Sequence, residues 1–416
     1  MTLDTGPAAA APPATGPSWK RPFFTLWTGQ VISLLGSGLV QFAIVWWLTK
    51  QTGSGSVLTT AVLLAMLPAV LLAPVAGVVV DRSSRRWVMI VSDGTVALAT
   101  LALAVLFALG RVEVWHVYLT LFVRGAAGAF QLPAAQSTIS LMVPEAHLAR
   151  VAGLNQMVQG LLTVAAPPLG ALVLGVMPFQ AVMSIDVVTA MFAIGACLVV
   201  AIPRPAATAH AAKPSFVSEM REGLRYVWGW PGLMAVLVMA MVINFFLVAA
   251  ATLMPILVTE HFGGEMMHLA TLESIFGGGA IIGGVTLGLW GGFRPRILTT
   301  LMGLIGIGAG FLLMGLTPHN RFGMGLASAF LAASMIPMAN GPITAVVQAS
   351  VAPGMQGRVF ALIQSAVTAI APVGLVVAGP VADVMGVRAW YVMGGAVCAA
   401  MGVVGFFVPA VRRIER

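Results

Sequence analysis

The sequence is poor in charged residues and, among these, in lysine. Charged residues make up 8% of its 416 residues, whereas a soluble domain normally has about 25%. None of the three lysines, Lys20, Lys50 and Lys213, follows a glycine, which excludes a phosphate-binding Walker loop. The sequence also lacks His-Glu-x-x-His and Gly-x-Ser-x-Gly, so it carries no hydrolase signature. We therefore expect neither an enzyme nor a chain that binds ATP by itself, and we expect no cofactor.

Cysteine is also scarce. The two cysteines, Cys197 and Cys398, lie within apolar stretches in opposite halves of the chain. Cysteines placed in this way behave as small buried apolar residues. The sequence therefore indicates no disulfide framework.

Long apolar runs dominate what the sequence does contain. Residues 57–80 and 87–110 are long enough to cross a hydrocarbon core of about 30 Å, which takes a helix of about 20 residues. In lipid the backbone must satisfy its own hydrogen bonds, which favours helices. We predict an all-α membrane protein with twelve transmembrane helices, at residues 24–49, 57–80, 87–110, 116–140, 151–176, 180–203, 231–258, 268–292, 297–317, 323–348, 358–384 and 388–411.

The positive charges lie mostly on one side of this arrangement. Of the 21 lysines and arginines, 16 fall in segments on the same side as the N-terminus, four fall on the opposite side, and Arg124 lies within a span. Loops rich in lysine and arginine stay in the cytoplasm. We therefore predict a multi-pass protein of the bacterial inner membrane with both termini in the cytoplasm. The net charge of +8 then reflects topology, and we expect no nucleic-acid partner.

The predicted spans divide into two groups of six. Residues 204–230 form the longest polar interruption, which we interpret as a cytoplasmic linker with an amphipathic surface helix at 215–228. It separates an N-terminal bundle at 23–203 from a C-terminal bundle at 231–411. Residues 1–22 are predicted to be a disordered tail rather than a signal peptide, and 412–416 a short C-terminal tail.

The two halves resemble each other in sequence. One motif recurs after 208 residues, at the start of the fifth span of each half. Its copies are Arg150-Val151-x-x-Leu154-x-Gln156 and Arg358-Val359-x-x-Leu362-x-Gln364. This recurrence indicates a duplicated six-helix unit, and parallel repeats around a central site are an architecture of transporters.

Several short motifs carry a resemblance to a known family. The loop after the second span reads Gly77-x-x-x-Asp81-Arg82-x-x-Arg85-Arg86 and resembles the signature loop of the major facilitator superfamily. Three further segments are similar to the drug:proton antiporter branch, which contains macrolide-efflux proteins and enterobactin-type siderophore exporters. They are Leu26-Trp27-x-Gly29-Gln30-x-x-Ser33, Asn340-Gly341-Pro342 and Gln356-Gly357-Arg358-Val359-Phe360. The resemblance extends from Lys20 over nearly all of the chain.

This resemblance implies proton-coupled export of lipophilic, macrolide-like molecules by alternating access, by a monomer in the lipid bilayer. One motif departs from the pattern. The antiporters carry Gly-Pro-x-x-Gly-Gly in span five, where this chain has Ala166-Pro167-Pro168-Leu169-Gly170-Ala171. Alanine still permits close helix packing. A siderophore or lysophospholipid transporter of the same fold, and a non-transporting sensor or scaffold, remain alternatives.

The signature loop suggests a gate. The positive-inside bias accounts for its arginines but not for Asp81. A carboxylate at a helix N-terminus is stabilising by about 0.3–1 kcal/mol, and the eleventh span begins on the same side, near Arg358. We predict a cytoplasmic gate that holds the halves together when closed inside. Its residues would be Gly77, Asp81, Arg82, Arg85, Arg86, Asp93 and Arg358.

Two residues are predicted to couple transport to protons. A charge such as Arg124 costs at least about 2.5 kcal/mol inside the membrane, so we expect it to face the bundle interior. Arg124-Gly125-x-x-Gly128 resembles the span-four arginine motif of drug antiporters, which implies proton coupling. The alternative is a structural arginine that caps carbonyl groups between helices. Glu273 is our candidate for the group that takes up and releases the proton.

The remaining polar residues in spans receive simpler interpretations. We expect Asp186 to compensate a helix dipole and Asp383 to pair with Arg388. Gln41, Asn244 and Asn340 are candidate substrate contacts, with hydrogen bonding between helices as the alternative. The spacing Glu260-His261-x-x-x-Glu265-x-x-His268 suits a metal, but we interpret it as a solvated loop and expect no metal site.

Overall fold

The computed structural model describes residues 19–202, 224–351, 353–412 and 414–415. Twelve long helices run through these residues and confirm the predicted spans. They are α1 (Lys20–Thr52), α2 (Gly55–Arg82), α3 (Arg85–Ala108), α4 (Val114–Met142), α5 (Glu145–Val176), α6 (Phe179–Val199), α8 (Pro231–Ile256), α9 (Met266–Trp290), α10 (Arg296–Leu316), α11 (Phe322–Ser350), α12 (Pro353–Met385) and α13 (Val387–Phe407). A π-helical turn, η1 (Leu257–His261), extends α8, and a short helix, α14 (Pro409–Arg412), follows α13.

Eleven of these helices contain a segment long and apolar enough to cross a membrane. The twelfth, α4, has 29 residues and is therefore also long enough. It is less apolar because it carries Arg124 and the glutamines Gln131 and Gln136. The predicted tail at 1–22 falls mostly outside the described residues, since α1 already begins at Lys20. Most of the predicted amphipathic helix at 215–228 also lies outside them.

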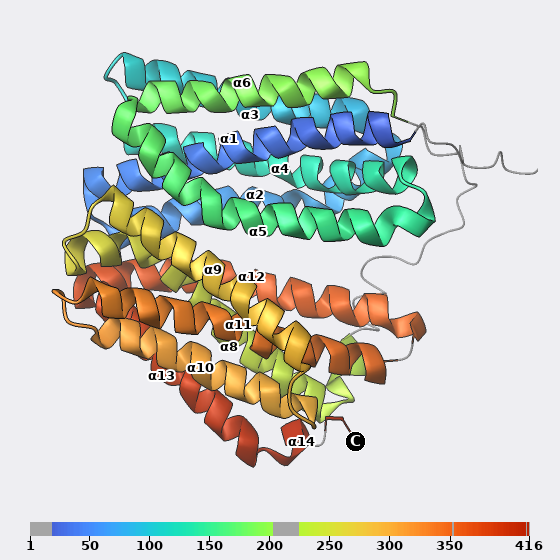
Figure 1. Ribbon diagram of the computed structural model, residues 1–416, viewed down its shortest axis with the longest axis vertical. Helices are drawn as coiled ribbons and strands as arrows, with labels where there is room; N and C mark the ends of the chain where they lie inside the picture. The colour runs from blue at the N-terminus through green and yellow to red at the C-terminus, as the bar shows by residue number, and fades with distance from the viewer. Residues whose placement is uncertain (1–18, 203–223, 352, 413, 416) are drawn as a thin grey trace, which may run out of the picture.

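The helices form two bundles of six, α1–α6 and α8–α13, which lie one above the other in Figure 1. The helix boundaries repeat the sequence duplication. Glu145 and Pro353 begin α5 and α12, Phe179 and Val387 begin α6 and α13, and each pair differs by 208 positions. The same interval separates the starts of α4 and α11. The fold thus confirms two six-helix repeats.

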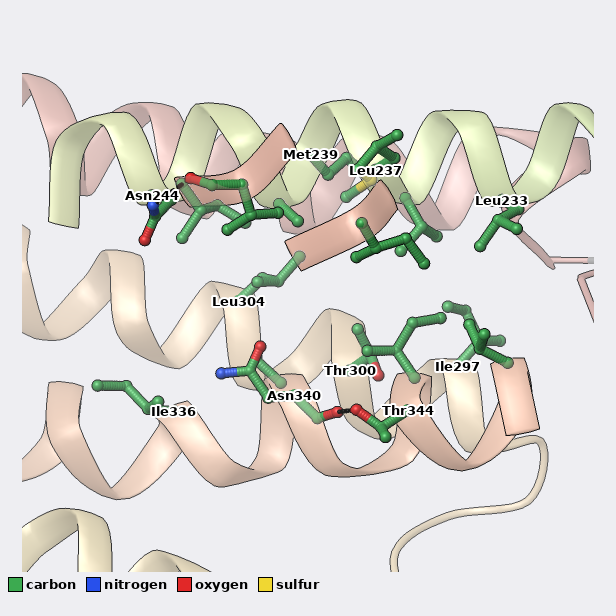
Figure 2. Close-up of a pocket in the computed structure, with 18 of the residues that line it drawn as sticks. Leu233, Leu237, Met239, Asn244, Ile297, Thr300, Leu304, Ile336, Asn340 and Thr344 are labelled. Carbon is green, nitrogen blue, oxygen red and sulfur yellow. Dashed lines mark hydrogen bonds between the residues drawn. The ribbon is translucent and has the colours of Figure 1, made fainter. Parts of the chain in front are cut away.

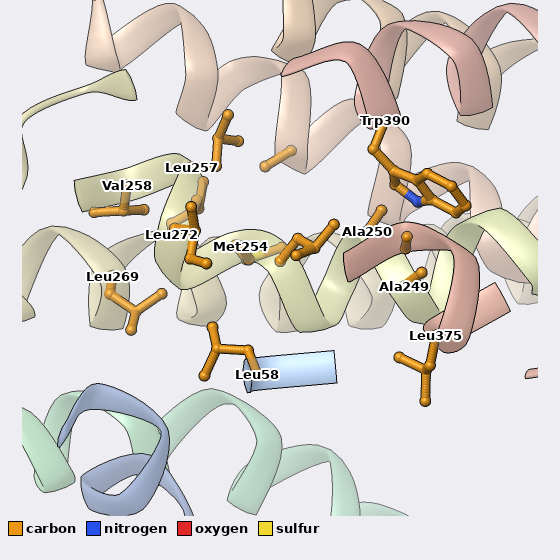
Figure 3. Close-up of a cluster of buried hydrophobic side chains, with 14 of the residues drawn as sticks. Leu58, Ala249, Ala250, Met254, Leu257, Val258, Leu269, Leu272, Leu375 and Trp390 are labelled. Atoms are coloured by element: carbon orange, nitrogen blue, oxygen red, sulfur yellow. The ribbon is translucent and has the colours of Figure 1, made fainter. Parts of the chain in front are cut away.

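The two ends of the bundles differ in how closely the halves meet. We call the end at which α1 begins and α6 ends the linker end, and the opposite end the far end. The halves meet through α2 with α12 and α5 with α9. At the far end, Gly379 of α12 packs against Ser56 and Thr59 of α2. Figure 3 shows Leu58 of α2 reaching toward the buried cluster around Met254 of α8.

The α5–α9 contact lies near the middle of both helices. The Ser274 hydroxyl of α9 donates to the Val164 carbonyl of α5 at 2.9 Å, and Gly277 packs against Thr163 and Val164. Toward the linker end the buried apolar residues form two separate clusters instead, one around Met89 with residues of the N-terminal half only and one around Leu233 with residues of the C-terminal half only. The cluster around Met254 contains residues of both halves. The halves are therefore joined from the middle to the far end and separate toward the linker end.

The variant antiporter stretch of α5 still packs closely against α1. A Cβ on Gly170 would lie 2.9 Å from the ring of Phe42, and a Cβ on Gly38 would lie 3.1 Å from the Cβ of Ala166. At both points, one helix presents a residue small enough for close approach. The alanine at position 166 is therefore compatible with a tight α1–α5 contact.

Candidate functional site

A cavity of about 700 Å³ lies in the C-terminal half toward the linker end. Helices α8, α10, α11 and α12 line it. Figure 2 shows Asn244 of α8 and Asn340 of α11 on facing walls, with Leu304 of α10 between them. The Asn244 amide donates to the Val367 carbonyl at 2.5 Å, so this side chain also links α8 to α12. The cavity thus contains two of the three predicted substrate-contact residues.

A second cavity, of about 500 Å³, lies at the corresponding place in the N-terminal half. Helices α1, α3, α4 and α5 line it, and its polar side chains are mostly amides. They are Gln30, Gln131, Gln136, Asn155, Gln156 and Gln159. Gln131 stands two residues before Pro133 as Asn340 stands two before Pro342, and Gln156 and Gln364 occupy the same position of the repeated motif. We did not single out Gln131 from the sequence, although its repeat position could have identified it.

A third cavity, of about 360 Å³, lies between the halves in the far part of the molecule. Gln41 of α1, Thr252 of α8 and Glu273 of α9 contribute its polar atoms, and most of the remaining lining is aliphatic. In the described part of the chain, no hydrogen bond or ion pair engages the Glu273 carboxyl group. The structure therefore brings Gln41 and Glu273 together, although they were predicted for different roles.

Arg124 lies inside the N-terminal bundle and is paired. Its guanidinium lies 2.6 Å from the carboxylate of Asp186, whose side chain is 1% exposed. The Thr100 hydroxyl accepts from Arg124 at 2.5 Å and donates to Asp186 at 3.0 Å, and Ser37 donates to the other Asp186 oxygen at 2.9 Å. The expectation that Asp186 only compensates a helix dipole is wrong. Asp186 neutralises a buried arginine and joins α1, α3, α4 and α6.

Asp93 is also held by side chains of its own half. It is 3% exposed. Its carboxylate accepts from the amides of Gln30, at 3.1 Å, and Gln131. Within the described ranges no bond joins it to Asp81, which was predicted to share a network with it. The structure instead places Asp93 behind the amide-lined cavity.

The remaining predicted gate residues lie at the linker end. Asp81 and Arg82 are exposed, and no hydrogen bond reaches Asp81 from the described part of α12. Arg85 donates to the Ser137 carbonyl at 3.4 Å, and Arg86 donates to the Leu198 carbonyl, so both link α3 to neighbours in the same half. Arg358 of α12 is partly buried and contacts the Met355 sulfur at 3.7 Å.

Asp383 has a different partner from the one expected. Its carboxylate accepts from the backbone N–H groups of Gly55, at 2.5 Å, and Ser56, at 3.1 Å, and from the Ser54 hydroxyl at 3.0 Å. Arg388 instead donates to the Gly315 carbonyl at 2.8 Å. The predicted Asp383–Arg388 pair is therefore wrong. Asp383 of the C-terminal half caps the first turn of α2 in the N-terminal half.

Three of the four acid and histidine residues at 260–268, namely His261, Glu265 and His268, have structural partners. The His268 ring accepts from the Glu265 backbone N–H at 3.1 Å, in a capping box at the start of α9. His261 contacts the Thr317 carbonyl at 2.8 Å. Among the described residues, no group of three or more histidine, cysteine or acidic side chains has an arrangement that could hold a metal ion.

Comparisons with known proteins agree with the geometry. The Major Facilitator Superfamily profile matches residues 26–374. Macrolide efflux protein A of Streptococcus pyogenes is 32% identical over 398 residues, which cover 96% of this chain and 98% of that protein. The multidrug efflux pump Tap of Mycobacterium tuberculosis is 24% identical over 408 residues, 95% of each chain.

Solved structures show the same fold at low sequence identity. A POT family transporter in complex with a thioalcohol-conjugated peptide aligns with a TM-score of 0.74 and 9% identity, over 95% of this chain and 97% of that chain. The nucleoside transporter NupG aligns with a TM-score of 0.64 and 13% identity, over 90% and 97%. The chain therefore belongs to the Major Facilitator Superfamily and is a multi-pass membrane transporter, not an enzyme.

Proposed function

We propose that this protein exports lipophilic small molecules, macrolide-like drugs among them, in exchange for protons by alternating access. The observation that carries the proposal is the arrangement of its two halves. They are joined from the middle to the far end and separate toward the linker end, where each half has a cavity of 500 Å³ or more. Cavities of this size suit drug-sized ligands. The efflux proteins to which the chain is similar support the same direction of transport.

The charge distribution supports a cytoplasmic linker end. Sixteen of the 21 lysines and arginines belong to segments on that side, and such bias identifies the cytoplasmic face. The conformation is then open to the cytoplasm, so that both cavities can take up a molecule from the cell or from the inner leaflet. Asn244, Asn340 and Gln41 are the proposed substrate contacts.

Glu273 is the proposed proton carrier. It lines a largely aliphatic cavity between the halves, close to the middle contact of α5 and α9. Carboxyl groups inside a membrane bundle that lack a charged partner often belong to proton pathways. Substrate arrival and proton loss can then compete at this site. Arg124 has a structural role in this proposal, because its charge is already balanced by Asp186 and the pair joins helices of the N-terminal bundle.

Asp81 is the proposed gate residue for the opposite conformation. It is exposed here, where the linker end is open, and nothing in the described part of α12 holds it. In the conformation closed to the cytoplasm, Asp81 would cap the start of α12 near Arg358. Such a contact contributes about 0.3–1 kcal/mol, or about 2 when partly buried, against about 5.5 kcal/mol for a full swing between states. The gate can therefore bias the equilibrium but cannot drive it alone.

The test is an efflux assay in bacteria that lack their own drug pumps. Cells that express the protein should accumulate less labelled macrolide than control cells, and a protonophore should abolish the difference. Glu273→Gln should lose most of the efflux at equal expression. Glu260→Gln, an exposed far-end carboxylate, is the matched control and should retain it.

Each outcome decides one part of the proposal. If cells that express the protein accumulate as much macrolide as control cells, the macrolide assignment is wrong. Siderophores and lysophospholipids would then be assayed in the same cells. Efflux that persists with the protonophore, or in Glu273→Gln, contradicts proton coupling through this carboxyl group.

A further inference from the structure

We propose that the cavity of the N-terminal half recognises the protonated amine of a lipophilic cation, with Asp93 as its buried counter-charge behind Gln30 and Gln131. This inference rests on the proposed function and names a class of substrate for it. The predicted substrate contacts Gln41, Asn244 and Asn340 do not line this cavity. Any preference of the cavity for a charged ligand must therefore come from other residues.

Asp93 is an acidic side chain deep inside a bundle that spans the membrane. It is 3% exposed, and no cation in the described part of the chain forms an ion pair with it. Arg86, two turns earlier on α3, donates to the Leu198 carbonyl instead. Acidic residues inside membrane bundles are costly, and they usually face a partner or a transport pathway. The nearest pathway here is the cavity in front of the two glutamines.

The two glutamines face both the carboxylate and the cavity. Gln30 and Gln131 each donate an amide N–H to Asp93, and Gln131 also donates to the Gln30 carbonyl at 3.2 Å. Only the NH₂ end of an amide can donate to a carboxylate, so the carbonyl oxygen of Gln131 is left for another donor. In the described residues no donor reaches this oxygen. Asp93 thus holds the nitrogen end of the Gln131 amide, which leaves the carbonyl oxygen, the negative end of the amide dipole, to accept from a ligand.

An aromatic ring completes the site. Trp27 lines the same cavity, and its indole N–H donates to the Asn155 side chain at 2.7 Å, which fixes the orientation of the ring. The face of a tryptophan ring attracts ammonium groups. A tryptophan ring, the free amide oxygen of Gln131 and a buried carboxylate together favour a cation over a neutral molecule of equal size. The volume of about 500 Å³ leaves room for an apolar body.

The corresponding cavity in the C-terminal half provides an internal comparison. Asn340 precedes Pro342 by two residues as Gln131 precedes Pro133, but the residues that line this cavity from α10 are Ile297, Thr300, Leu301, Leu304 and Ile307. Neither cavity has a carboxylate among its described lining residues, but α3 carries Asp93 behind the glutamines of one cavity, whereas α10 has no acidic residue. The two cavities are related by the repeat and differ in charge. The preference for a cation is therefore assigned to the N-terminal half.

A binding measurement on the full-length protein in lipid nanodiscs tests this inference. The probes are a pyrene-labelled dimethylalkylamine, protonated at neutral pH, and its isostere with a C–H carbon in place of the nitrogen. Binding to empty nanodiscs is subtracted. The wild-type protein should bind the amine about tenfold more tightly than the isostere, and Asp93→Asn should remove most of this ratio. Glu145→Gln, which removes an exposed acid at the same end of the same half, should keep it.

Two further arms guard against a variant that fails to fold. Trp27→Phe should lower the ratio about threefold while the protein keeps its melting transition. The ratio of amine to isostere affinity in the wild-type protein is itself a test that does not depend on the folding of any variant. Equal binding of the two probes by wild type overturns the proposal, as does a ratio that survives in Asp93→Asn or disappears in Glu273→Gln.

The efflux assay separates this inference from the proposed function. If the amine and the isostere are exported at equal rates and bind equally well, the proposed cation site is wrong and the proposed export function is retained. If the tenfold binding ratio is observed and depends on Asp93 but neither probe is exported, the export proposal is wrong and the proposed cation site is retained.

Discussion

At the scale of single residues, the desolvation cost of the buried ionisable side chains Arg124, Asp93 and Glu273 is offset in different ways. Arg124 is neutralised by Asp186 and tied to Thr100. Asp93 is solvated by two amide side chains, and Glu273 lines a cavity without a partner in the described residues. A paired charge suits a structural role, and an unpaired one suits a group that titrates or meets a ligand. This contrast is why we propose Glu273, and not Arg124, as the group that takes up the proton.

The Arg124–Asp186 pair yields a prediction about stability. Asp186→Asn leaves Arg124 buried without its counter-charge and should destabilise the protein by about 3–5 kcal/mol. The double variant Arg124→Met with Asp186→Leu replaces both charges with apolar groups and should recover most of this loss. The measurement is the melting temperature of the purified protein in detergent.

The efflux assay on the same variants separates structure from coupling. A double variant that folds and still exports in a protonophore-sensitive manner shows that Arg124 is structural. Loss of coupling in a well-folded double variant would instead contradict the structural role and favour direct participation of Arg124.

At the scale of helices, glycines decide how closely neighbours approach. A Cβ on Gly283 of α9 would overlap the Ser334 carbonyl of α11, and a Cβ on Gly279 would lie 2.8 Å from the Phe330 carbonyl. Gly278 lies next to Gly279 in sequence, but no atom would lie within 4 Å of its Cβ. The α9–α11 contact therefore depends on one face of α9 only.

This difference predicts unequal effects of the same substitution. Gly283→Ala should destabilise the protein by about 1–3 kcal/mol, because the backbone of α11 must move away. Gly278→Ala, in the same helix, should change stability by no more than about 0.5 kcal/mol. Thermal unfolding in detergent tests both. Equal melting temperatures for the two variants would contradict the close approach of α9 and α11 at Gly283.

At the scale of the whole molecule, α2 and α12 run antiparallel and have an acid near each end of their contact. At the far end, Asp383 of α12 caps the start of α2 through two backbone N–H groups and the Ser54 hydroxyl. At the linker end, Asp81 of α2 is exposed and faces no described partner on α12. The capped end is closed and the uncapped end is open. We infer that the two acids stabilise opposite conformations.

The two acids should therefore shift the conformational equilibrium in opposite directions. Asp383→Asn removes the negative charge that caps the start of α2, and this charge contributes about 1 kcal/mol to the far-end contact. Its loss should raise the population that is open at the far end about fivefold. Asp81→Asn should lower that population. The measurement is the distance between spin labels at Arg111→Cys and Arg321→Cys, exposed far-end positions in opposite halves, after Cys197→Ala and Cys398→Ala.

Arg388→Gln is the control for this experiment. Arg388 also lies at the far end, but its hydrogen bond stays within the C-terminal half. Its loss should leave the distance distribution unchanged. If Asp81→Asn and Asp383→Asn shift the distance distribution in the same direction, the two acids do not stabilise opposite conformations, and the inference is refuted.

Much of this protein was determined by the sequence alone. Twelve helices, their approximate limits and the duplication at an interval of 208 residues all follow from apolar runs and a repeated motif, because in lipid each apolar segment must form a helix by itself. The signature loop and the site candidates Arg124 and Glu273 could also be recognised locally. These features depend on residues that are neighbours in the chain.

Only the tertiary structure decided which polar groups meet. Arg124 and Asp186 are 62 positions apart, and Asp383 and Ser54 are 329 apart. A charge inside the bundle must find a partner, but its position on a helix does not say which helix supplies it. For this reason the expected roles of Asp186 and Asp383 were wrong, and the contact between Asp93 and two glutamines was missed. Which end of the bundles is open also depends on contacts between the halves, whose residues are more than 100 positions apart in the chain.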